Sequence, residues 1–207
     1  TLAELICGLT KPSEGQIFVD GIDLNDKSKE AKEARKHIGI VFQYPEYQLF
    51  EETVLKDVMF GPRNHGIEEA ECEKLAKDAL ALVGLTDEEY DKSPFSLSGG
   101  QKRRVAIAGV LAMEPKVLIL DEPSAGLDPK GHNDILDMIQ KIKVERNMTI
   151  ILVSHDMNDV AEFANKIAVL KRGRLVMYGT PREIFGDKEK LTQAGLSLPS
   201  GALLLEE

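Results

Sequence analysis

The chain has 207 residues, 43% of them hydrophobic and 29% charged, and its formal net charge is -9. This is the composition of a folded globular protein, and the length suits one α/β domain with or without a small subdomain, but not two full-sized domains. The acidic balance argues against nucleic acid as a partner, because phosphate backbones repel acidic surfaces, and the basic trio Lys102, Arg103 and Arg104 is too short to change this.

The apolar runs and the cysteines limit the class of protein further. The longest apolar runs, at 117–120 and 149–153, are far shorter than the roughly 20 residues of a membrane helix, so any membrane role has to come through a partner. Cys7 and Cys72 have neither CxxC spacing nor companion histidines. They indicate no disulfide framework and no zinc site, and they suit a reducing cytoplasm.

The first residues predict an amphipathic helix that Pro12 and Gly15 end. Its apolar positions have helical spacing: Leu2, Leu5, Ile6 and Leu9. The chain opens inside this helix with neither an initiating Met nor a signal peptide, so we expect the natural polypeptide to begin upstream.

Two strands and a charged stretch are predicted next. Residues 16–21 are typical of a short strand that runs into a turn, and residues 38–42 of a buried strand with Gln43 at its end. Between them, the charged residues 27–36 predict an exposed segment.

Helical periodicity follows over residues 51–113, which we interpret as a helical insert in an α/β core. One helix of this insert has an apolar face, with Gly84 at the position of a C-terminal cap. The residues of that face are Cys72, Leu75, Ala76, Ala79, Leu80 and Val83.

Strands and helices alternate after the insert, which is typical of a parallel sheet covered by helices. The predicted elements are strands at 117–120, 149–153 and 167–170 and helices at 130–143 and 158–164. A tight turn at 172–174 then leads to an antiparallel strand at 175–178. Thr180, Pro181 and Glu183 combine an N-cap, a proline at the first helical position and a capping-box glutamate, which predicts a helix start.

Two adjacent carboxylates, Asp121 and Glu122, follow the apolar strand at 117–120. In an open parallel sheet, ligands bind at the carboxyl ends of the strands. Two adjacent acids suit metal–phosphate chemistry, in which one holds Mg²⁺ and the next takes a proton from the attacking water. The alternative is a strand that ends in a solvated acidic turn.

The pentapeptide Leu97–Gln101 predicts an anion site. Gly99 and Gly100 allow a ligand close to the backbone, and Ser98 can cap the helix that follows, so that free N–H groups and the positive end of the helix dipole face outward. The alternative is an ordinary capped helix start.

Five elements in this order resemble the ATP-binding cassette (ABC) ATPases, over essentially the whole chain. They are Gln43 after a strand, the LSGGQ loop at 97–101, the ILDEP strand end at 119–123, the Ser124–Asp128 loop, and His155 after the next strand. Ser124 stands where many members of the family have threonine, and it keeps the hydroxyl. The resemblance implies an α/β fold of the P-loop NTPase type, as a single domain over 1–207. Its parallel-sheet core would cover about 1–43 and 114–207, and its inserted helical subdomain about 44–113.

The resemblance also implies roles for individual residues, with ATP and Mg²⁺ as cofactors. Asp121 would hold Mg²⁺ through water, and Glu122 would be the general base. Gln43 would contact the same metal and water and would couple this site to a membrane partner. His155 would bond the γ-phosphate, although a lone histidine at a strand end is more often structural.

Subunits of this family close head to tail, as homodimers or heterodimers. Ser98, Gly99 and Gly100 would then bind the γ-phosphate of ATP held by the second ABC ATPase subunit, and Asp128 would lie at the dimer seam. The family's phosphate loop, a Gly-rich segment that ends in Gly-Lys-Ser-Thr, should precede the first helix. Thr1 is identified as its last hydroxyl, so the chain is expected to be N-terminally truncated and, as it stands, inactive.

Residues 41–54, with 57–62 beyond them, resemble the energy-coupling factor (ECF) importers of vitamins or transition-metal ions. This implies an ATPase at the cytoplasmic face of the cell membrane, with a transmembrane coupling protein and a substrate-binding membrane protein as partners. For Tyr44, Tyr47 and Phe50, ordinary packing against the helical insert is the alternative. Two other functions stay open: a soluble ABC ATPase of translation or DNA repair, and a non-catalytic binding module.

Overall fold

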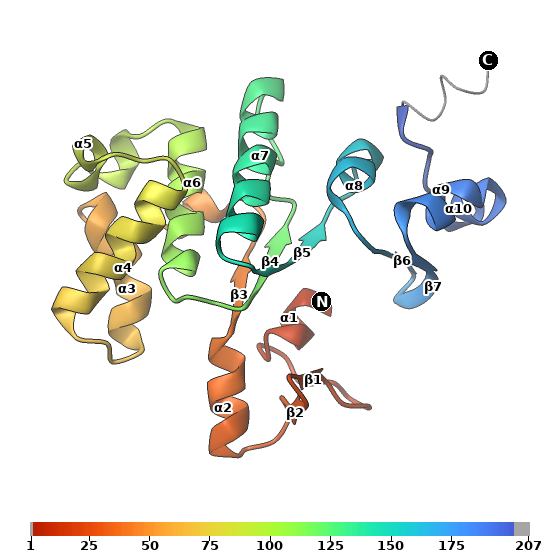
Figure 1. Cartoon of the computed structure of the whole chain (residues 1–207), viewed down its shortest axis with the longest axis horizontal. Helices are drawn as coiled ribbons and strands as arrows, with labels where there is room; N and C mark the ends of the chain where they lie inside the picture. Colours follow the sequence, from red (N-terminus) through yellow and green to blue (C-terminus); the bar gives the residue numbers. More distant parts are fainter. Residues whose placement is uncertain (1, 201–207) are drawn as a thin grey trace. The chain divides into compact units, whose positions relative to one another are not determined.

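The computed structural model describes residues 2–200 of the chain. Thr1, which the sequence predicts to bind ATP, lies outside the described residues. The chain divides into two units, Thr1–Val153 and Ser154–Glu207 (Figure 1). We describe each unit by itself.

The first unit contains a parallel sheet of three strands, β3 (Ile38–Val41), β4 (Val117–Asp121) and β5 (Thr149–Val153), in the order β3-β4-β5. The strands predicted at 38–42, 117–120 and 149–153 are therefore confirmed, and so is the parallel α/β class. In the register of the sheet, Val41 pairs with Leu120, and Leu120 pairs with Leu152. The carboxyl ends of the three strands consequently lie at one edge.

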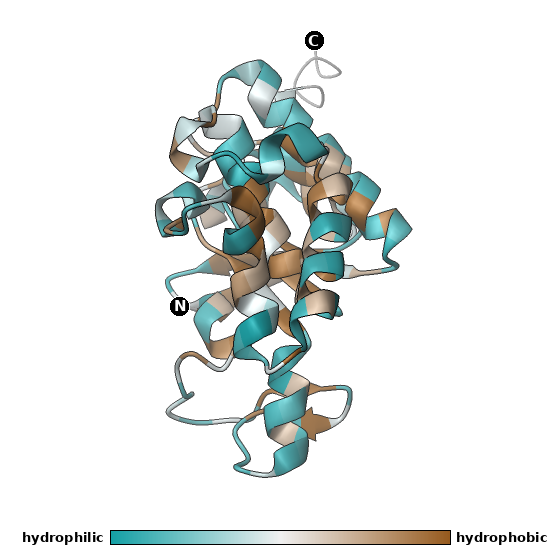
Figure 2. Cartoon of the chain, turned by 90° about the vertical axis from the view of Figure 1, so that its left-hand side faces the viewer, coloured by the Kyte–Doolittle hydropathy of each residue, from teal (hydrophilic) through white to brown (hydrophobic). Residues whose placement is uncertain are grey.

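Apolar packing around the central strand stabilises this sheet. Leu118, Ile119 and Leu120 of β4 are fully buried, as expected for a parallel strand with both faces covered. Ile119 packs in one core cluster with Ala34 of α2 (Lys29–Lys36) and with Ile6 of α1 (Leu2–Ile6). In Figure 2 the hydrophobic segments of the sheet lie inside and α2 is mostly hydrophilic.

The charged segment predicted as exposed at 27–36 is mostly helix α2, whose charged side chains are exposed apart from the half-buried Arg35. Ala31 and Ala34, three residues apart, are buried on one face, and Ser28 caps the helix by accepting a bond from the backbone N–H of Ala31. The small apolar face was missed because lysine, arginine and glutamate surround both alanines.

The N-terminal region differs from its prediction at two points. Helix α1 ends at Ile6, before Pro12, because Gly8 adopts a left-handed conformation with φ 71°. The short strand and turn predicted at 16–21 are β1 (Phe18–Val19) and the turn after it, and a second strand that was not predicted, β2 (Ile22–Asp23), completes a hairpin. Its two-residue turn, Asp20 and Gly21, has positive φ angles of 50° and 78°, as a type I′ turn requires.

The helical insert consists of α3 (Val54–Asn64), α4 (Glu69–Leu82), the single turn α5 (Asp87–Tyr90) and α6 (Gly99–Leu111). Helix α6 contacts α3 and α4 on one side, and β3 and α7 (Pro129–Glu145) on the other. Gly84 follows α4 with φ 79°, so the predicted cap is confirmed. The division into a core and a helical subdomain stays a prediction.

The second unit contains α8 (Met157–Phe163), the antiparallel strands β6 (Ile167–Lys171) and β7 (Arg174–Gly179), α9 (Pro181–Gly186) and α10 (Lys188–Ala194). The predicted turn and hairpin are confirmed. So is the helix start, where Thr180 and Glu183 form a reciprocal capping box. Its core is made by Ile167, Val169, Ile184 and Leu191.

Within residues 2–200, no helix combines the length and the apolar character that crossing a membrane requires.

Candidate nucleotide site

The carboxyl edge of the parallel sheet brings Gln43, Asp121 and Glu122 to one end of the first unit. Val41 and Leu120 are register partners in β3 and β4. Gln43 follows Val41 by two residues, and Asp121 and Glu122 directly follow Leu120. The two strands therefore deliver an amide oxygen and two carboxylates to neighbouring positions of the edge where α/β sheets bind ligands.

Glu122 has an uncommon backbone conformation. Its φ angle is 50°, in the left-handed region that residues other than glycine rarely adopt. Its N–H donates to the carbonyl of Val153 at 3.0 Å, which ties it to the end of β5, and its carbonyl accepts from the N–H of Ala125 at 3.1 Å. The side chains of Asp121 and Glu122 are both half-buried.

Oxygen donors of this kind fit Mg²⁺. Mg²⁺ keeps several waters and binds proteins through one or two carboxylates plus substrate phosphates, so the oxygen donors of Asp121 and Gln43 are of the kind that would hold it. Over the described residues, no group of three or more histidine, cysteine, aspartate or glutamate side chains is placed to hold a metal ion.

The predicted anion site lies at the start of α6. The hydroxyl of Ser98 accepts from the N–H of Gln101 at 3.3 Å, and the Gln101 side chain accepts from the N–H of Ser98 at 3.1 Å. The predicted N-cap is thus confirmed. Gln101 completes a capping box that sequence reasoning missed, although the Ser-x-x-Gln spacing indicates it. A Cβ on Gly99 or Gly100 would meet no atom within 4 Å, so the backbone there is open to a ligand.

A pocket of about 430 Å³ lies beside this helix start. Ser98 and Gly100 of α6 line it together with Gly131, in the first turn of α7. Asp128 caps α7 by accepting from the N–H of Gly131 at 2.8 Å. The N-terminal turns of two helices thus open on one pocket, which is also lined by Arg104 and by two acidic residues, Glu89 and Asp134.

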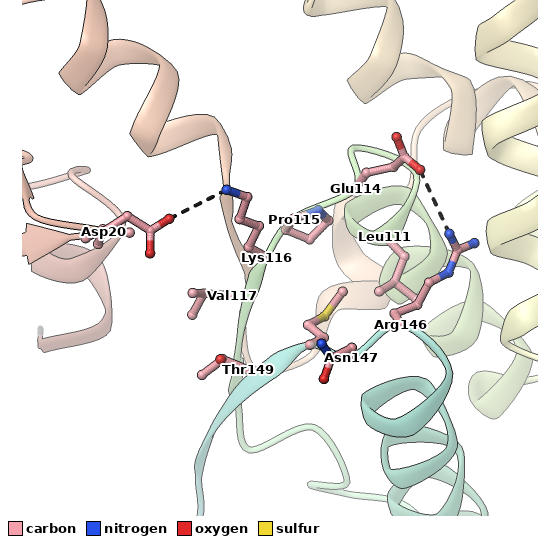
Figure 3. A pocket seen from close by; sticks show the side chains of 11 residues that line it. Asp20, Leu111, Glu114, Pro115, Lys116, Val117, Arg146, Asn147 and Thr149 are labelled. Atoms are coloured by element: carbon pink, nitrogen blue, oxygen red, sulfur yellow. Dashed lines mark ion pairs between the residues drawn. The ribbon is translucent and has the colours of Figure 1, made fainter.

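A second pocket of about 430 Å³ lies at the opposite edge of the sheet (Figure 3). The first residues of β4 and β5, Val117 and Thr149, line it. Its cations are paired: Lys116 lies 3.6 Å from Asp20, and Arg146 lies 3.9 Å from Glu114. This pocket is remote from the carboxylates of the sheet edge, and its charges are largely neutralised.

Two predicted site residues are not among the described residues of the first unit. His155 is exposed and belongs to the second unit, two residues after the end of β5. Its predicted role at the γ-phosphate stays a prediction, as does the ATP-binding role of Thr1.

Aromatic side chains are exposed beyond Gln43. Tyr47 in the 3₁₀ turn η1 (Pro45–Gln48) is 83% exposed, and Tyr44 and Phe50 are 40% and 56% exposed. The ring of Phe50 packs edge-on against Phe60 of α3, at 4.8 Å between centroids. We call Tyr44, Tyr47, Phe50 and Phe60 the aromatic surface.

Arg103 is a residue whose importance the sequence does not indicate. It belongs to the basic trio after the LSGGQ loop, yet only 1% of it is exposed. Its guanidinium binds Glu46 and two backbone carbonyls, of Pro123 and Ala125. All of these partners are distant in sequence, so no local pattern predicts the contacts.

Solved structures share this fold. The whole chain superposes on 82% of cbiO1 from Clostridium perfringens, which is part of the ABC transporter complex cbiONQ, with a TM-score of 0.81 and 42% identity. A dimeric ATP-binding cassette in a post-hydrolysis state, bound to ADP and phosphate, matches 87% of this chain and 79% of its own, with a TM-score of 0.73 and 32% identity. The fold is therefore that of the ABC ATPases, a class of P-loop NTPases.

Sequence comparisons identify the family. A family model described as ABC transporter matches residues 1–125. The chain is 55% identical, over all of its 207 residues and 72% of the relative, to the energy-coupling factor transporter ATP-binding protein EcfA2 of Caldanaerobacter subterraneus subsp. tengcongensis. It is also 55% identical to EcfA2 of Clostridium acetobutylicum, covering 73% of that protein. This chain belongs to the ABC transporter family, as an ATP-binding, ATP-hydrolysing component.

Proposed function

We propose that the chain is the ATPase part of an ECF importer, in which ATP binding and hydrolysis at a head-to-tail dimer interface drive the uptake of a vitamin or a transition-metal ion through membrane partners. The observation that supports this most directly is the 55% identity to EcfA2 proteins over the whole chain. The aligned region includes both halves of a composite site: the sheet edge of one subunit and the LSGGQ helix of the other.

Asp121 and Glu122 have separate roles in the proposed reaction. Asp121 would hold Mg²⁺ through water, and the ion would supply positive charge to stabilise the phosphates of ATP. Glu122 accepts the proton of the attacking water, and its backbone bonds to Val153 and Ala125 hold it in position. Gln43, at the end of the neighbouring strand, orients the same water, and His155 bonds the γ-phosphate.

The start of α6 serves the nucleotide of the other subunit. Ser98, Gly99 and Gly100 offer open backbone at a helix N-terminus of a 13-residue helix, where N–H groups point at an incoming anion. In a closed dimer this anion is the γ-phosphate of ATP bound to the second subunit. Asp128, which caps the neighbouring α7, lies at the seam.

The aromatic surface suits a membrane partner. Phe50 is held rigidly, because its backbone N–H and that of Glu51 both donate to the carboxylate of Asp57 at 2.9 Å. Exposed, rigid aromatic rings are typical of protein interfaces. We propose that the transmembrane coupling protein docks here, directly beyond Gln43, which places the ATPase peripherally at the cytoplasmic face of the membrane.

Co-purification tests this proposal. A tagged polypeptide that also carries a phosphate loop upstream of Thr1 is expressed with its native membrane proteins, which are then extracted in detergent. We expect a transmembrane coupling protein to co-purify, and Tyr47→Arg to abolish it, because the added charge cannot be buried in an apolar interface. Phe18→Arg, at an exposed phenylalanine of β1, is the matched control and should leave co-purification intact.

The same preparation distinguishes the alternative functions. A soluble ABC ATPase of translation or DNA repair would yield ribosomal or DNA-bound partners and no membrane protein. ATP-dependent uptake by proteoliposomes of the purified complex, measured with candidate vitamins and metal ions, then identifies the solute.

A further inference from the structure

Arg103 of α6 is a charged side chain that is almost completely enclosed, with 1% of it exposed. A buried guanidinium is costly unless its N–H groups are paired. Its Nε and Nη2 atoms donate to the two carboxylate oxygens of Glu46 at 3.1 and 2.8 Å. Its Nη1 atom donates to the carbonyls of Pro123 and Ala125 at 3.0 and 2.7 Å.

These partners belong to two segments that flank the site. Glu46 lies in η1, three residues after Gln43, and the two carbonyls belong to the loop directly after Glu122. Arg103 itself follows the LSGGQ loop by two residues. One guanidinium therefore connects the Gln43 segment, the loop from Glu122 to Asp128, and the helix whose N-terminus is the proposed γ-phosphate site.

A ring contact strengthens this connection. The guanidinium carbon of Arg103 lies 5.8 Å from the centroid of the Tyr44 ring. The same ring packs on the loop after Glu122, because a Cβ built on Gly126 would be 3.2 Å from Tyr44 Cε1. The Tyr44 ring thus lies close both to the Arg103 guanidinium and to the loop that follows Glu122.

The backbone at both ends of this connection is strained. Glu122 and Tyr44 have φ angles of 50° and 55°. Residues other than glycine keep such conformations only where the surroundings hold them, and this strain clusters at functional sites. Arg103 provides that restraint, since it fixes the carbonyl of the residue directly after Glu122 and the carbonyl two residues further on.

We propose that Arg103 is a positioning residue for Glu122. Its guanidinium holds the 123–125 loop against α6 and Glu46. This restraint aligns the Glu122 carboxylate for proton transfer. Because Glu46 belongs to the Gln43 segment, a movement of that segment also shifts Glu122 through the same hydrogen bonds. This rests on the proposed function, in which Glu122 is the general base. Arg103 itself contacts neither nucleotide nor water in this role.

The test is a double-mutant cycle in the ATPase dimer that carries its phosphate loop. Arg103→Met and Arg103→Lys are made alone and together with Glu122→Gln, and kcat, KM, ATP affinity and melting temperature are measured. We expect Arg103→Met to lower kcat about tenfold or more while the ATP dissociation constant changes less than about twofold, because a residue that only positions the base affects the transition state and not ATP binding. Arg103→Lys, which keeps the charge but not the forked geometry, should be intermediate.

Non-additivity is the decisive measurement. In the Glu122→Gln background, Arg103→Met should change the residual rate by less than about twofold, because the group that it positions is already gone. Arg35→Met is the matched control. Arg35 also donates to two backbone carbonyls, of Leu24 and Asp26, but within the N-terminal region. It should lower the melting temperature and leave kcat unchanged.

Two results would overturn the inference. One is a full multiplicative loss in the Glu122→Gln background, and the other is a kcat loss for Arg103→Met no larger than that for Arg35→Met. If Arg103→Met does not fold, Arg103→Lys and Glu46→Gln are each combined with Glu122→Gln in the same double-mutant cycle. If Glu122→Gln alone leaves turnover unchanged, both the proposed general base and the role of Arg103 are wrong. If Glu122→Gln is slow but the effects of the two substitutions multiply, only the role of Arg103 is wrong.

Discussion

Gly39 of β3 lies directly against Val110 of α6: a Cβ built on Gly39 would be 2.5 Å from Val110 Cγ1 and 3.2 Å from Pro115 Cγ. No Cβ can approach another carbon so closely. Glycine at this position therefore allows the helix that starts with the LSGGQ loop to pack on the strand that leads to Gln43.

We accordingly expect Gly39→Ala to destabilise the protein by about 1–3 kcal/mol, the usual cost of forcing an extra carbon into a close-packed core. Gly109→Ala is the matched control in the same interface helix, where a Cβ would meet no atom within 4 Å. It should stabilise α6 by about 0.5–1 kcal/mol, since alanine is the better helix former. Chemical unfolding of both variants measures the difference, and equal effects of both would contradict it.

Glu122→Gln should reduce ATP hydrolysis by about 100-fold or more, which is the scale of a lost general base, while ATP binding persists and a closed dimer accumulates. Glu114→Gln is the control: Glu114 is another glutamate with a φ angle of 50°, but it pairs with Arg146 at the opposite edge of the sheet. Steady-state turnover and size-exclusion chromatography with ATP measure both effects. Normal turnover in Glu122→Gln would remove this residue from the base role.

Gly100→Asp should abolish hydrolysis by the dimer but not ATP binding by the single subunit. Within the chain a Cβ at this position meets no neighbouring atom within 4 Å, so we expect the fold to be kept. Against the γ-phosphate of a partner's ATP, an added carboxylate about 4 Å away costs about 4 kcal/mol at an effective dielectric constant of 20. Gly186→Asp, in α9, adds the same charge with equal room and should stay active.

Equilibrium binding of a fluorescent ATP analogue to the isolated subunit checks the Gly100→Asp prediction. Retained binding places the loop against the partner's nucleotide. Lost binding would mean that the loop acts on the ATP of its own subunit.

Cys7 should react slowly with alkylating reagents in the native protein. Burial raises the pKa of its thiol to about 11, so little thiolate exists at pH 8. Iodoacetamide labelling of a Cys72→Ala variant should be roughly 100-fold slower than that of the urea-unfolded chain, for which the thiol pKa is about 8.5. Equal rates would show that Cys7 is not buried.

The same shift makes stability depend on pH in one direction. Because the folded-state pKa is the higher one, the folded protein binds the Cys7 proton more tightly. Its stabilising contribution is complete below about pH 8.5 and is lost as the pH rises toward about 11. A Cys7→Ala variant should lack this part of the alkaline decline in stability.

Elements with a strong local pattern could be predicted from the sequence alone. The apolar runs that became β4 and β5 have the predicted bounds to within one residue, and Ser98 caps α6 as its position before two glycines indicates. The adjacent carboxylates, Asp121 and Glu122, also lie at the expected sheet edge. In each case the information is local: periodicity, capping chemistry or the end of a strand.

Only the tertiary structure decided the features that depend on distant residues. Arg103 looks like part of a solvated basic trio, yet its partner Glu46 is 57 residues away in sequence, and the loop carbonyls that it binds are 20 and 22 residues away. Charged side chains are buried only where such partners converge, and no window of sequence contains them. For the same reason the sequence does not predict α2, because Ala34 becomes part of a buried face only once Leu24, Ile38 and Ile119 pack with it.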